Sequence, residues 1–399
     1  MLIEELKYII QSAHINFLYG SGVSRPYLIT LGNIEDYLTQ LEKDKTLKED
    51  TRKILKASIY KAYSEGVIIP NYVFPLHNAD FVKTTKAYNE FFHIWNDLIN
   101  KRSSLLLDKQ INLFTTNIDL LVEHTLANTG LELNDGFRGT LNPIFDETNF
   151  QISLSKSSMQ YHKSSEIPIF NLMKIHGAVN WDETNECIQS NIFRTGRIEK
   201  LLNAIPKNNF ITLTKTDSEG NIVNVNYDEL VKKAESITLT DSNVFDKFFE
   251  EYEKIVMINP TKEKFRSSVM DYHFYELMRI FSNSLERENS VLFVMGFSFA
   301  DEHIAQIVKR SAATNPTLQV IIFAYSDNDA NDYTHNLDIS AGGVNNNITV
   351  VTPKKFKEDN SKPDRIKSYK DLLTDIEYFD LTTINKVFNQ IAVEIHSPI

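Results

Sequence analysis

The chain has 399 residues, enough for one large domain with insertions or for two domains, each with a sizeable core. Its 42 basic and 53 acidic residues give a net charge of -11, which disfavours direct nucleic-acid binding and an anionic-membrane surface. The single cysteine, Cys187, excludes an intrachain disulfide and a cysteine-rich zinc ribbon, and it fits a reducing compartment. The N-terminus lacks the pattern of a secretion signal, and no apolar run approaches the ~20 residues that span a bilayer, so we expect a cytoplasmic protein with no membrane partner.

A short apolar run begins at Ile15 and breaks at a Gly-Ser-Gly turn that ends at Ser24. The run is too short for a helix, so it predicts a buried parallel strand, preceded by an amphipathic helix over residues 2–12. The turn would expose backbone N–H groups, which suit a pyrophosphate if a helix begins just beyond it. The third glycine of the usual dinucleotide-binding fingerprint is missing, so the turn by itself is only a weak indication of a phosphate site.

The next part of the chain is mostly helical. From Asn33 to Lys109 the apolar spacing predicts a helical insertion that caps the sheet edge. A second strand, Ile111 to Phe114, then leads through Thr115 to Asp119 into a helix, which places polar residues at the C-terminal end of a strand, where open α/β sheets bind ligands. From Leu131 to Glu166 the polar sequence shows little periodicity and predicts long surface loops.

Residues 170–175 predict a third strand, which delivers His176-Gly177 to its C-terminal end. Residues 181–250 form a second predicted insertion with helices and a small hairpin. A regular succession of strand and helix follows, with Asp301 as a helix cap, and predicts parallel pairing with right-handed crossovers. Its strands are expected at residues 255–258, 291–295, 318–323 and, at the edge, 348–351, before a C-terminal helix over about 372–395.

These patterns together predict an α/β fold with a Rossmann-like, mostly parallel sheet. We expect one catalytic domain over residues 1–353, with insertions at about 33–109 and 181–250. A C-terminal helical extension would occupy residues 354–399.

The four strand ends, taken in chain order, resemble the sirtuin family of NAD-consuming enzymes. That family carries Gly-Ala-Gly-x-Ser, Thr-Gln-Asn-Ile-Asp, His-Gly and Gly-Thr-Ser motifs. The corresponding segments here are Gly20-Ser21-Gly22-Val23-Ser24, Thr116-Asn117-Ile118-Asp119, His176-Gly177 and Gly296-Phe297-Ser298. The resemblance implies a sirtuin-like fold and NAD+ as the substrate.

The resemblance also implies roles for the matching residues. Asn117 would orient the nicotinamide ribose hydroxyls or a water, and His176 would act as the general base. Cleaving the N-glycosidic bond of NAD+ builds positive charge on the ribose, so such a site needs orientation and a base that titrates near neutrality. Asp119 would hold the nicotinamide carboxamide. The residues implied to contact NAD+ are Gly20, Ser21, Gly22 and Ser24 around the pyrophosphate, Thr116 and Asp119, and Gly296 and Ser298 on the adenosine side.

The chain departs from sirtuins that remove acyl groups from lysine. It has one cysteine, so the four-cysteine zinc module cannot exist, and it has no counterpart of the Pro-Asp-Phe-Arg sequence or of the acyl-peptide clamp. These losses point to water as the acceptor, and the segment from Gly296 to His303 is similar to that of sirtuin-like NAD hydrolases of bacterial antiphage defence. Membership of that group implies depletion of NAD+ during infection, a homo-oligomer and, in some members, pairing with a HerA-type DNA-translocating ATPase.

Simpler interpretations exist for each residue. His176 could be a structural histidine, Asn117 and Asp119 could cap the following helix, and Asp301 is expected to cap a helix rather than to catalyse. A basic excess between Lys354 and Lys370 fits a solvated loop. The alternative functions are a protein deacylase or ADP-ribosyltransferase, which would modify a protein target, and a non-catalytic NAD-binding sensor or scaffold, which would bind without consuming.

Overall fold

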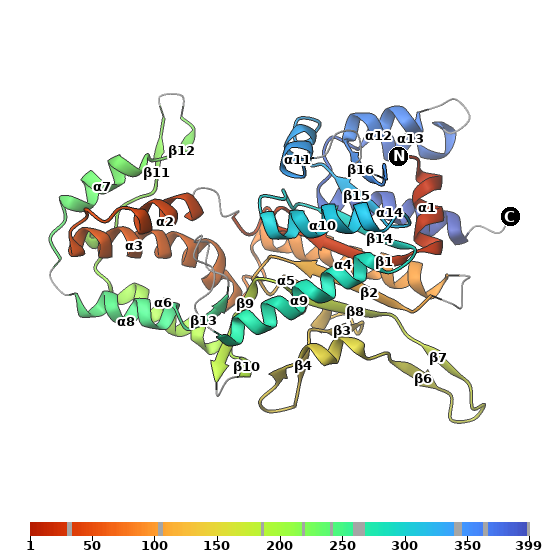
Figure 1. The fold of residues 1–399 in the computed structure, drawn as a ribbon, viewed down its shortest axis with the longest axis horizontal. Coiled ribbons are helices and arrows are strands. Elements are labelled where there is room, and N and C mark those ends of the chain that lie inside the picture. The colour runs from red at the N-terminus through yellow and green to blue at the C-terminus, as the bar shows by residue number, and fades with distance from the viewer. Residues whose placement is uncertain are drawn as a thin grey trace.

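The fold is built on a central sheet of seven strands that are all parallel (Figure 1). The computed structural model describes residues 1–29, 34–102, 107–184, 187–217, 220–239, 242–257, 268–338, 345–361 and 366–396. The strand order is β16-β15-β14-β1-β2-β8-β3, which confirms the predicted α/β, Rossmann-like sheet. The strands are β1 (His14–Tyr19), β2 (Gln110–Thr115), β3 (Glu132–Asn134), β8 (Ile169–Lys174), β14 (Ser290–Met295), β15 (Gln319–Phe323) and β16 (Ile348–Val351).

The direction of the strand order reverses between β1 and β14. Strands β2 and β8 follow on one side of β1, and β14, β15 and β16 follow on the other. In open α/β sheets, ligands bind outside the C-terminal ends of the strands at such a reversal point. The glycine turn after β1 and the Gly296 segment after β14 therefore lie where a ligand is expected.

Helices cover both faces of the sheet because alternate residues of each buried strand point to opposite faces. Phe17 lies on one face, where its ring contacts Trp95 at 4.9 Å and Phe388 at 6.5 Å between centroids. Leu18 lies on the other face, in a separate hydrophobic cluster. The first face is covered by α1 (Ile3–Ser12), α4 (Ala79–Asn100) and α14 (Leu381–His396), and the second by α9 (Ser268–Glu286) and α10 (Glu302–Thr314).

A row of asparagines, of which two are buried and two are half-buried, crosses one half of the sheet. Asn16, Asn112, Asn171 and Asn134 lie opposite one another on the neighbouring strands β1, β2, β8 and β3. Their side chains are joined by hydrogen bonds of 2.9–3.0 Å: Asn112 donates to Asn16, Asn171 donates to Asn112, and Asn134 donates to Asn171. A slip of one residue would break every bond in the row, so the row fixes the register of these strands.

A helical module lies beside the sheet, at the left of Figure 1. It combines segments that are far apart in the sequence, as the stacked rings of Tyr60 and Tyr252 illustrate, with centroids 3.9 Å apart. The helices predicted within residues 33–109 therefore do not form one insertion. The first two of them belong to this module, whereas α4 packs on the sheet. The module contains α2 (Ile34–Lys43), α3 (Glu49–Tyr63), α6 (Phe193–Ala204), α7 (Tyr227–Glu235), α8 (Asn243–Tyr252) and the predicted hairpin, β11 (Thr214–Thr216) with β12 (Ile222–Asn224). The predicted domain boundaries stay a prediction.

A second, antiparallel sheet corrects two expectations from the sequence. The run at 255–257 forms β13, but it pairs antiparallel with β9 in this sheet instead of joining the parallel one; Ile258 lies outside the described residues. Residues 131–166 contain short strands as well as loops. Three-residue runs carry no information about their pairing partner, so only the folded chain decides it. The sheet order is β13-β9-β10-β5-β4, made of β13 (Ile255–Met257), β9 (Gly177–Thr184), β10 (Cys187–Ser190), β5 (Ile144–Phe145) and β4 (Phe137–Arg138), and β6 (Ser155–Ser157) and β7 (Ser164–Glu166) form a separate hairpin.

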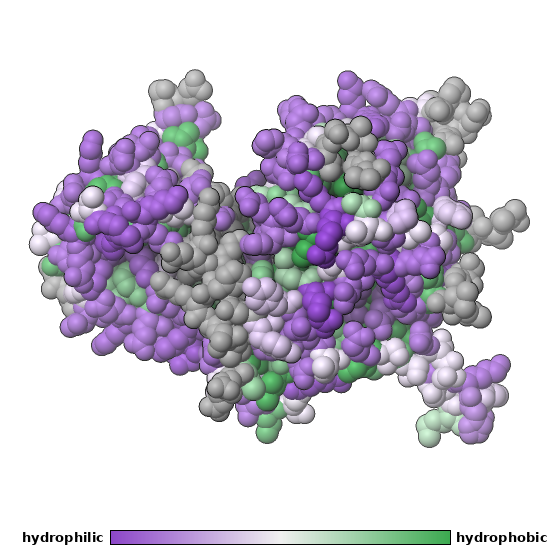
Figure 2. Space-filling view, in the orientation of Figure 1, coloured by the Kyte–Doolittle hydropathy of each residue, from purple (hydrophilic) through white to green (hydrophobic). Residues whose placement is uncertain are grey.

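The remaining elements are short or lie near the C-terminus. None of the helices in the described parts of the chain is both long and apolar enough to cross a membrane. Figure 2 shows that the face of the molecule seen in Figure 1 is predominantly hydrophilic, with hydrophobic residues in small separate groups. The short or C-terminal helices are α5 (Leu121–Ala127), α11 (Ala330–Asn336), α12 (Pro353–Asn360) and α13 (Ile366–Thr374). Four 3-10 helical turns are η1 (Ser21–Ser24), η3 (Ile69–Asn71), η4 (Glu147–Gln151) and η5 (Lys207–Asn209) in the described residues, and η2 (Ser64–Ile68) is a π-helical turn.

Candidate functional site

Glycines bring the ends of β1 and β14 into direct contact. The Gly20 N–H donates to the carbonyl of Met295 at 3.2 Å, and the Gly22 N–H donates to that of Gly296 at 3.1 Å. A Cβ on Gly20 would lie 2.8 Å from the Gly296 oxygen, and one on Gly22 would lie 2.7 Å from the Gly296 Cα. Gly296 itself has a φ of +57°, which disfavours other residues. The Gly20 and Gly22 amides therefore hold the two strand ends together, instead of pointing freely toward a phosphate as the sequence suggested.

Asn117 ties the end of β2 to the glycine turn. Its amide nitrogen donates to the Gly20 carbonyl and to the Ser24 hydroxyl, both at 3.0 Å. The Gly20 carbonyl can only accept, so it fixes the orientation of the amide. Both N–H groups of the amide are engaged, and the carbonyl oxygen Oδ1 is the end of the side chain that can accept a hydrogen bond from a ligand hydroxyl or a water.

Ser24 is the centre of this network and is only 1 % exposed. Its hydroxyl donates to Asp119 Oδ2 at 2.8 Å, so its single proton is already used. The hydroxyl of Tyr88, 3.3 Å away, must therefore donate to Ser24. The other oxygen of Asp119 accepts the N–H of Leu121 at 3.1 Å, at the start of α5, so the predicted capping role and a place in the site coexist in one carboxylate.

The Asp119 carboxylate lies among tyrosines. Burial, with the charge of Asp119 adding to it, raises the pKa of Tyr27 to about 12 and raises those of Tyr63 and Tyr88 as well. These phenols therefore stay protonated at neutral pH. Each oxygen of Asp119 holds one donor and has lone pairs left, so the carboxylate can still accept the N–H₂ of an aromatic amide in aromatic surroundings.

The segment after β8 runs alongside the segment after β2. The Ile175 N–H donates to the Thr115 carbonyl at 2.9 Å, and the Val179 N–H donates to that of Ile118 at 3.0 Å. His176 lies between these two contacts, so the fold places it beside residues 115–118. Gly177 has a φ of +76° and packs so close to β13 that a Cβ would lie 2.2 Å from the Val256 oxygen, which explains why glycine follows the histidine.

His176 forms a pair with Asp301. Its Nε2 lies 3.1 Å from Asp301 Oδ2, and the two side chains are 17 % and 11 % exposed. The other oxygen of Asp301 accepts the N–H groups of His303 and Ile304 and so caps α10, which confirms the predicted cap. Because an ionised carboxylate only accepts, it favours the tautomer with the proton on Nε2 and leaves Nδ1 as the basic nitrogen.

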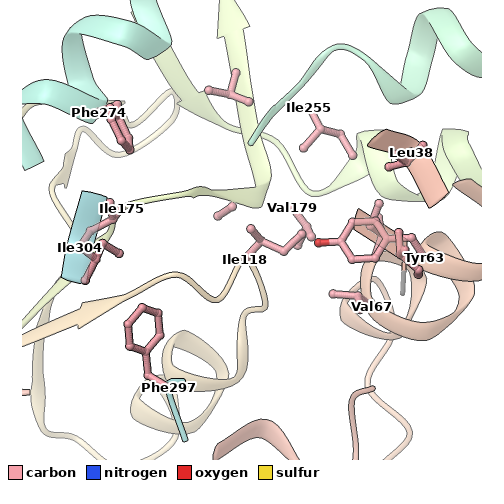
Figure 3. Close-up of a cluster of buried hydrophobic side chains, with 14 of the residues drawn as sticks. Leu38, Tyr63, Val67, Ile118, Ile175, Val179, Ile255, Phe274, Phe297 and Ile304 are labelled. Atoms are coloured by element: carbon pink, nitrogen blue, oxygen red, sulfur yellow. The ribbon is translucent and has the colours of Figure 1, made fainter. Parts of the chain in front are cut away.

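A hydrophobic cluster packs against the segments that follow β2, β8 and β14. Figure 3 shows Ile118, Ile175 and Ile304 in one buried group, each next to a site segment, together with Val179 and Phe297. Tyr63 of the helical module joins the same cluster. The polar segments are therefore carried on a common rigid base, although they come from distant parts of the chain.

The remaining predicted residues are arranged less tightly. Thr116 and Ser21 are half-buried beside the network. Ser298 is exposed, and its carbonyl accepts a hydrogen bond from Asn336 at 2.8 Å. Within the described residues, no group of three or more His, Cys, Asp or Glu side chains could hold a metal ion. The sequence analysis missed the pairing of Asp301 with His176, although the spacing after Gly296 had marked Asp301 as a cap.

Comparison with models of protein families gives a match over part of the chain. Among curated proteins, none matches this chain. A family model described as the SIR2-like domain matches residues 249–341. That region contains β14, Gly296, Ser298 and Asp301, whereas the glycine turn, Asn117 and His176 lie outside it. The match supports a relationship to the sirtuin-like family, whose members are often NAD-utilising enzymes.

Proposed function

We propose that the protein is an NAD+ hydrolase that releases nicotinamide and ADP-ribose. The observation that carries this proposal is the bond from Asn117 to both Gly20 and Ser24, which joins the predicted catalytic amide to the predicted dinucleotide turn. The second support is His176, which follows β8 and is held by Asp301, which follows β14. The SIR2-like match adds a family in which NAD+ use is common.

The proposed reaction divides the work between these groups. The bond between the ribose C1′ and the nicotinamide nitrogen breaks, and its electron pair neutralises the pyridinium. Asp119 would hold the carboxamide of the leaving nicotinamide, and Asn117 Oδ1 would accept a hydrogen bond from a ribose hydroxyl or from the attacking water. Water then bonds to C1′, and its proton passes to His176 Nδ1 while Asp301 stabilises the imidazolium.

Water is the acceptor that the chain favours. A lysine deacylase of the zinc-containing type needs four cysteines, and this sequence has one. The residues in place can position NAD+ and take up a proton. A protein substrate would need a peptide-binding clamp, for which the sequence has no counterpart.

The experiment is to incubate purified protein with NAD+ and to measure nicotinamide and ADP-ribose by chromatography. Equal amounts of the two products support hydrolysis, whereas attachment of ADP-ribose to protein or loss of an acyl group from a lysine peptide indicates the alternatives. Saturable NAD+ binding without turnover in any assembly state would indicate a sensor. Turnover that is unchanged in His176→Ala would remove the proposed mechanism.

An unregulated hydrolase of this kind would deplete its own cell, so we propose that an assembly restrains it. The proposed role is NAD+ depletion in antiphage defence, with a homo-oligomer and a HerA-type ATPase as partners. Mass photometry of the purified protein, with and without the product of the neighbouring gene, tests this. A monomer that is fully active alone would contradict it.

A further inference from the structure

The peptide group between Asp119 and Leu120 is held at both of its polar atoms by buried side chains from distant parts of the chain. Its carbonyl oxygen accepts a hydrogen bond from the ammonium of Lys174, at the end of β8. Its N–H donates to Asn71 Oδ1, in η3, at 2.8 Å. Lys174 is 3 % exposed and Asn71 is 1 % exposed. Together these two residues form what we call the Asp119 clamp, which fixes the plane of this peptide group.

Both residues of the Asp119 clamp are themselves held in place. Lys174 Nζ lies 2.8 Å from Glu123 Oε1, in the first turn of α5. Asn71 Nδ2 donates to the carbonyl of Val67, four residues earlier, at 2.6 Å. Because a carbonyl can only accept, this bond turns Asn71 Oδ1 toward the clamped N–H. The clamp therefore joins β8, α5 and the segment after α3 at one peptide group.

Packing does not explain a lysine at position 174. All six residues of β8 are buried, and strands of this kind usually carry continuous apolar runs. Burying an ammonium is costly, and apolar residues in place of a buried ion pair are often neutral for stability or improve it. The contact that apolar residues could not replace is the hydrogen bond from Lys174 to the Asp119 carbonyl.

The Asp119 clamp controls where the Asp119 carboxylate points. The N–H of Leu121 comes one residue after the clamped peptide group, and it holds Asp119 Oδ1 at 3.1 Å. If the clamped peptide group turned, this N–H would move with it. The carboxylate would then lose one of its two donors and keep the Ser24 hydroxyl at 2.8 Å on Oδ2. A carboxylate that turns freely cannot offer its remaining lone pairs to a ligand at a fixed place.

We propose that Lys174 and Asn71 are positioning residues, which fix the Asp119 carboxylate for the carboxamide of nicotinamide and do not contact the substrate themselves. The inference rests on the proposed function for the identity of this ligand. It separates the two halves of the substrate, because the clamp acts on the group that holds nicotinamide and not on the groups that hold ADP-ribose.

The test is to titrate nicotinamide into the protein in the presence of saturating ADP-ribose and to follow binding by ligand-observed NMR. The double variant Lys174→Met with Glu123→Leu removes one half of the clamp and leaves no buried charge without its partner. Asn71→Ala removes the other half and keeps the ion pair. Each variant should bind nicotinamide about 10-fold more weakly, the order of loss for a hydrogen bond to a charged group. Binding of ADP-ribose, measured by calorimetry, should be unchanged because it has no carboxamide.

Asn360→Ala is the matched control. Asn360 is fully buried, its Oδ1 accepts the N–H of Ile3 at 3.1 Å, and its Nδ2 donates to the carbonyl of Phe356, four residues earlier, at 2.8 Å. It thus makes the same kinds of bond as Asn71, but between α12 and α1. Asn360→Ala should lose a similar free energy of unfolding in urea and bind nicotinamide as the wild type does. Equal losses of nicotinamide affinity in Asn360→Ala and Asn71→Ala would overturn the positioning role, because general loosening would then explain both.

Turnover of NAD+ separates this inference from the proposed function. If NAD+ is cleaved and the clamp variants bind nicotinamide as tightly as the wild type, the positioning role is wrong and the hydrolase stands. If NAD+ is not cleaved but nicotinamide binding depends on Lys174 and Asn71, the positioning role stands and the hydrolase fails. A wild type that binds no nicotinamide also overturns the inference. If the double variant does not fold, the comparison of Asn71→Ala with Asn360→Ala decides.

Discussion

Replacing Asn117 with alanine separates the chemistry of the site from its stability. The change removes two hydrogen bonds, each 3.0 Å long, to Gly20 and Ser24. The Gly20 carbonyl keeps the N–H of Val23 at 3.2 Å, and the Ser24 hydroxyl keeps Tyr88, so neither acceptor is left alone. At about 1 kcal/mol for each bond, the free energy of unfolding should fall by about 2 kcal/mol.

That loss leaves a domain of ordinary stability almost entirely folded. Any large fall in activity must therefore come from the site, where Asn117 Oδ1 would orient the ribose or the water. We expect nicotinamide release to fall about 100-fold in kcat/KM, the order expected when a positioning group is lost. The assays are chromatographic measurement of nicotinamide and urea unfolding of the same protein samples.

Asn112→Ala is the matched control. Asn112 also makes two amide hydrogen bonds, to Asn16 and from Asn171, and it lies on β2, the strand that precedes Asn117, within the asparagine row of the sheet. It should lose a similar free energy of unfolding and keep its activity per folded molecule. Equal activity of the two variants, or activity of Asn117→Ala close to that of wild type, would refute the assigned role of Asn117.

Two further predictions concern carboxylates that pair with a histidine. Asp301→Asn should keep the cap of α10, because asparagine caps as well as aspartate, yet lower kcat about 100-fold by removing the charge beside His176; an unchanged kcat would show that the pair is structural. At Asp108, burial raises the pKa, but the contacts with His14 at 3.5 Å and with Arg287 at 2.7 Å outweigh it and lower the pKa to about 2. Because this pKa is lower in the folded than in the unfolded chain, the ionised carboxylate stabilises the protein above about pH 4, and this stabilisation is lost as the pH falls toward about 2. Between about pH 5 and pH 3, the free energy of unfolding of the wild type, measured in urea, should therefore fall by about 1 kcal/mol more than that of Asp108→Asn. This figure allows for the 30 % exposure of the carboxylate. Parallel pH profiles would contradict the assigned ion pair.

The strands and the residues at their C-terminal ends are the features that sequence patterns predicted best. Short apolar runs followed by turn residues were enough to predict β1, β2, β8, β14 and β15, and to place glycine, asparagine and histidine at their C-terminal ends. Buried parallel strands carry continuous apolar runs, so the signal is local and strong. The cap at Asp301 was also local, because it depends on this residue and on the N–H groups two and three positions further along the chain.

Other features depend on contacts between distant segments. The placement of β13 in the antiparallel sheet, the bond between His176 and Asp301, and the use of the Gly20 amide to bind β14 all join residues far apart in the sequence. The periodicity of the sequence does not predict such pairs, because neither a single side chain nor a three-residue strand indicates which distant residue it will contact.

The sequence by itself determined the elements of the sheet and which chemical groups end its strands, because burial and turn formation act on neighbouring residues. Only the tertiary structure decided which of those groups meet. It put Asn117 on Gly20 and Ser24, and it paired His176 with Asp301. The physical reason is that these contacts depend on how the sheet and its covering helices pack together. The order and register of these layers are fixed only when the whole chain folds and buries its core.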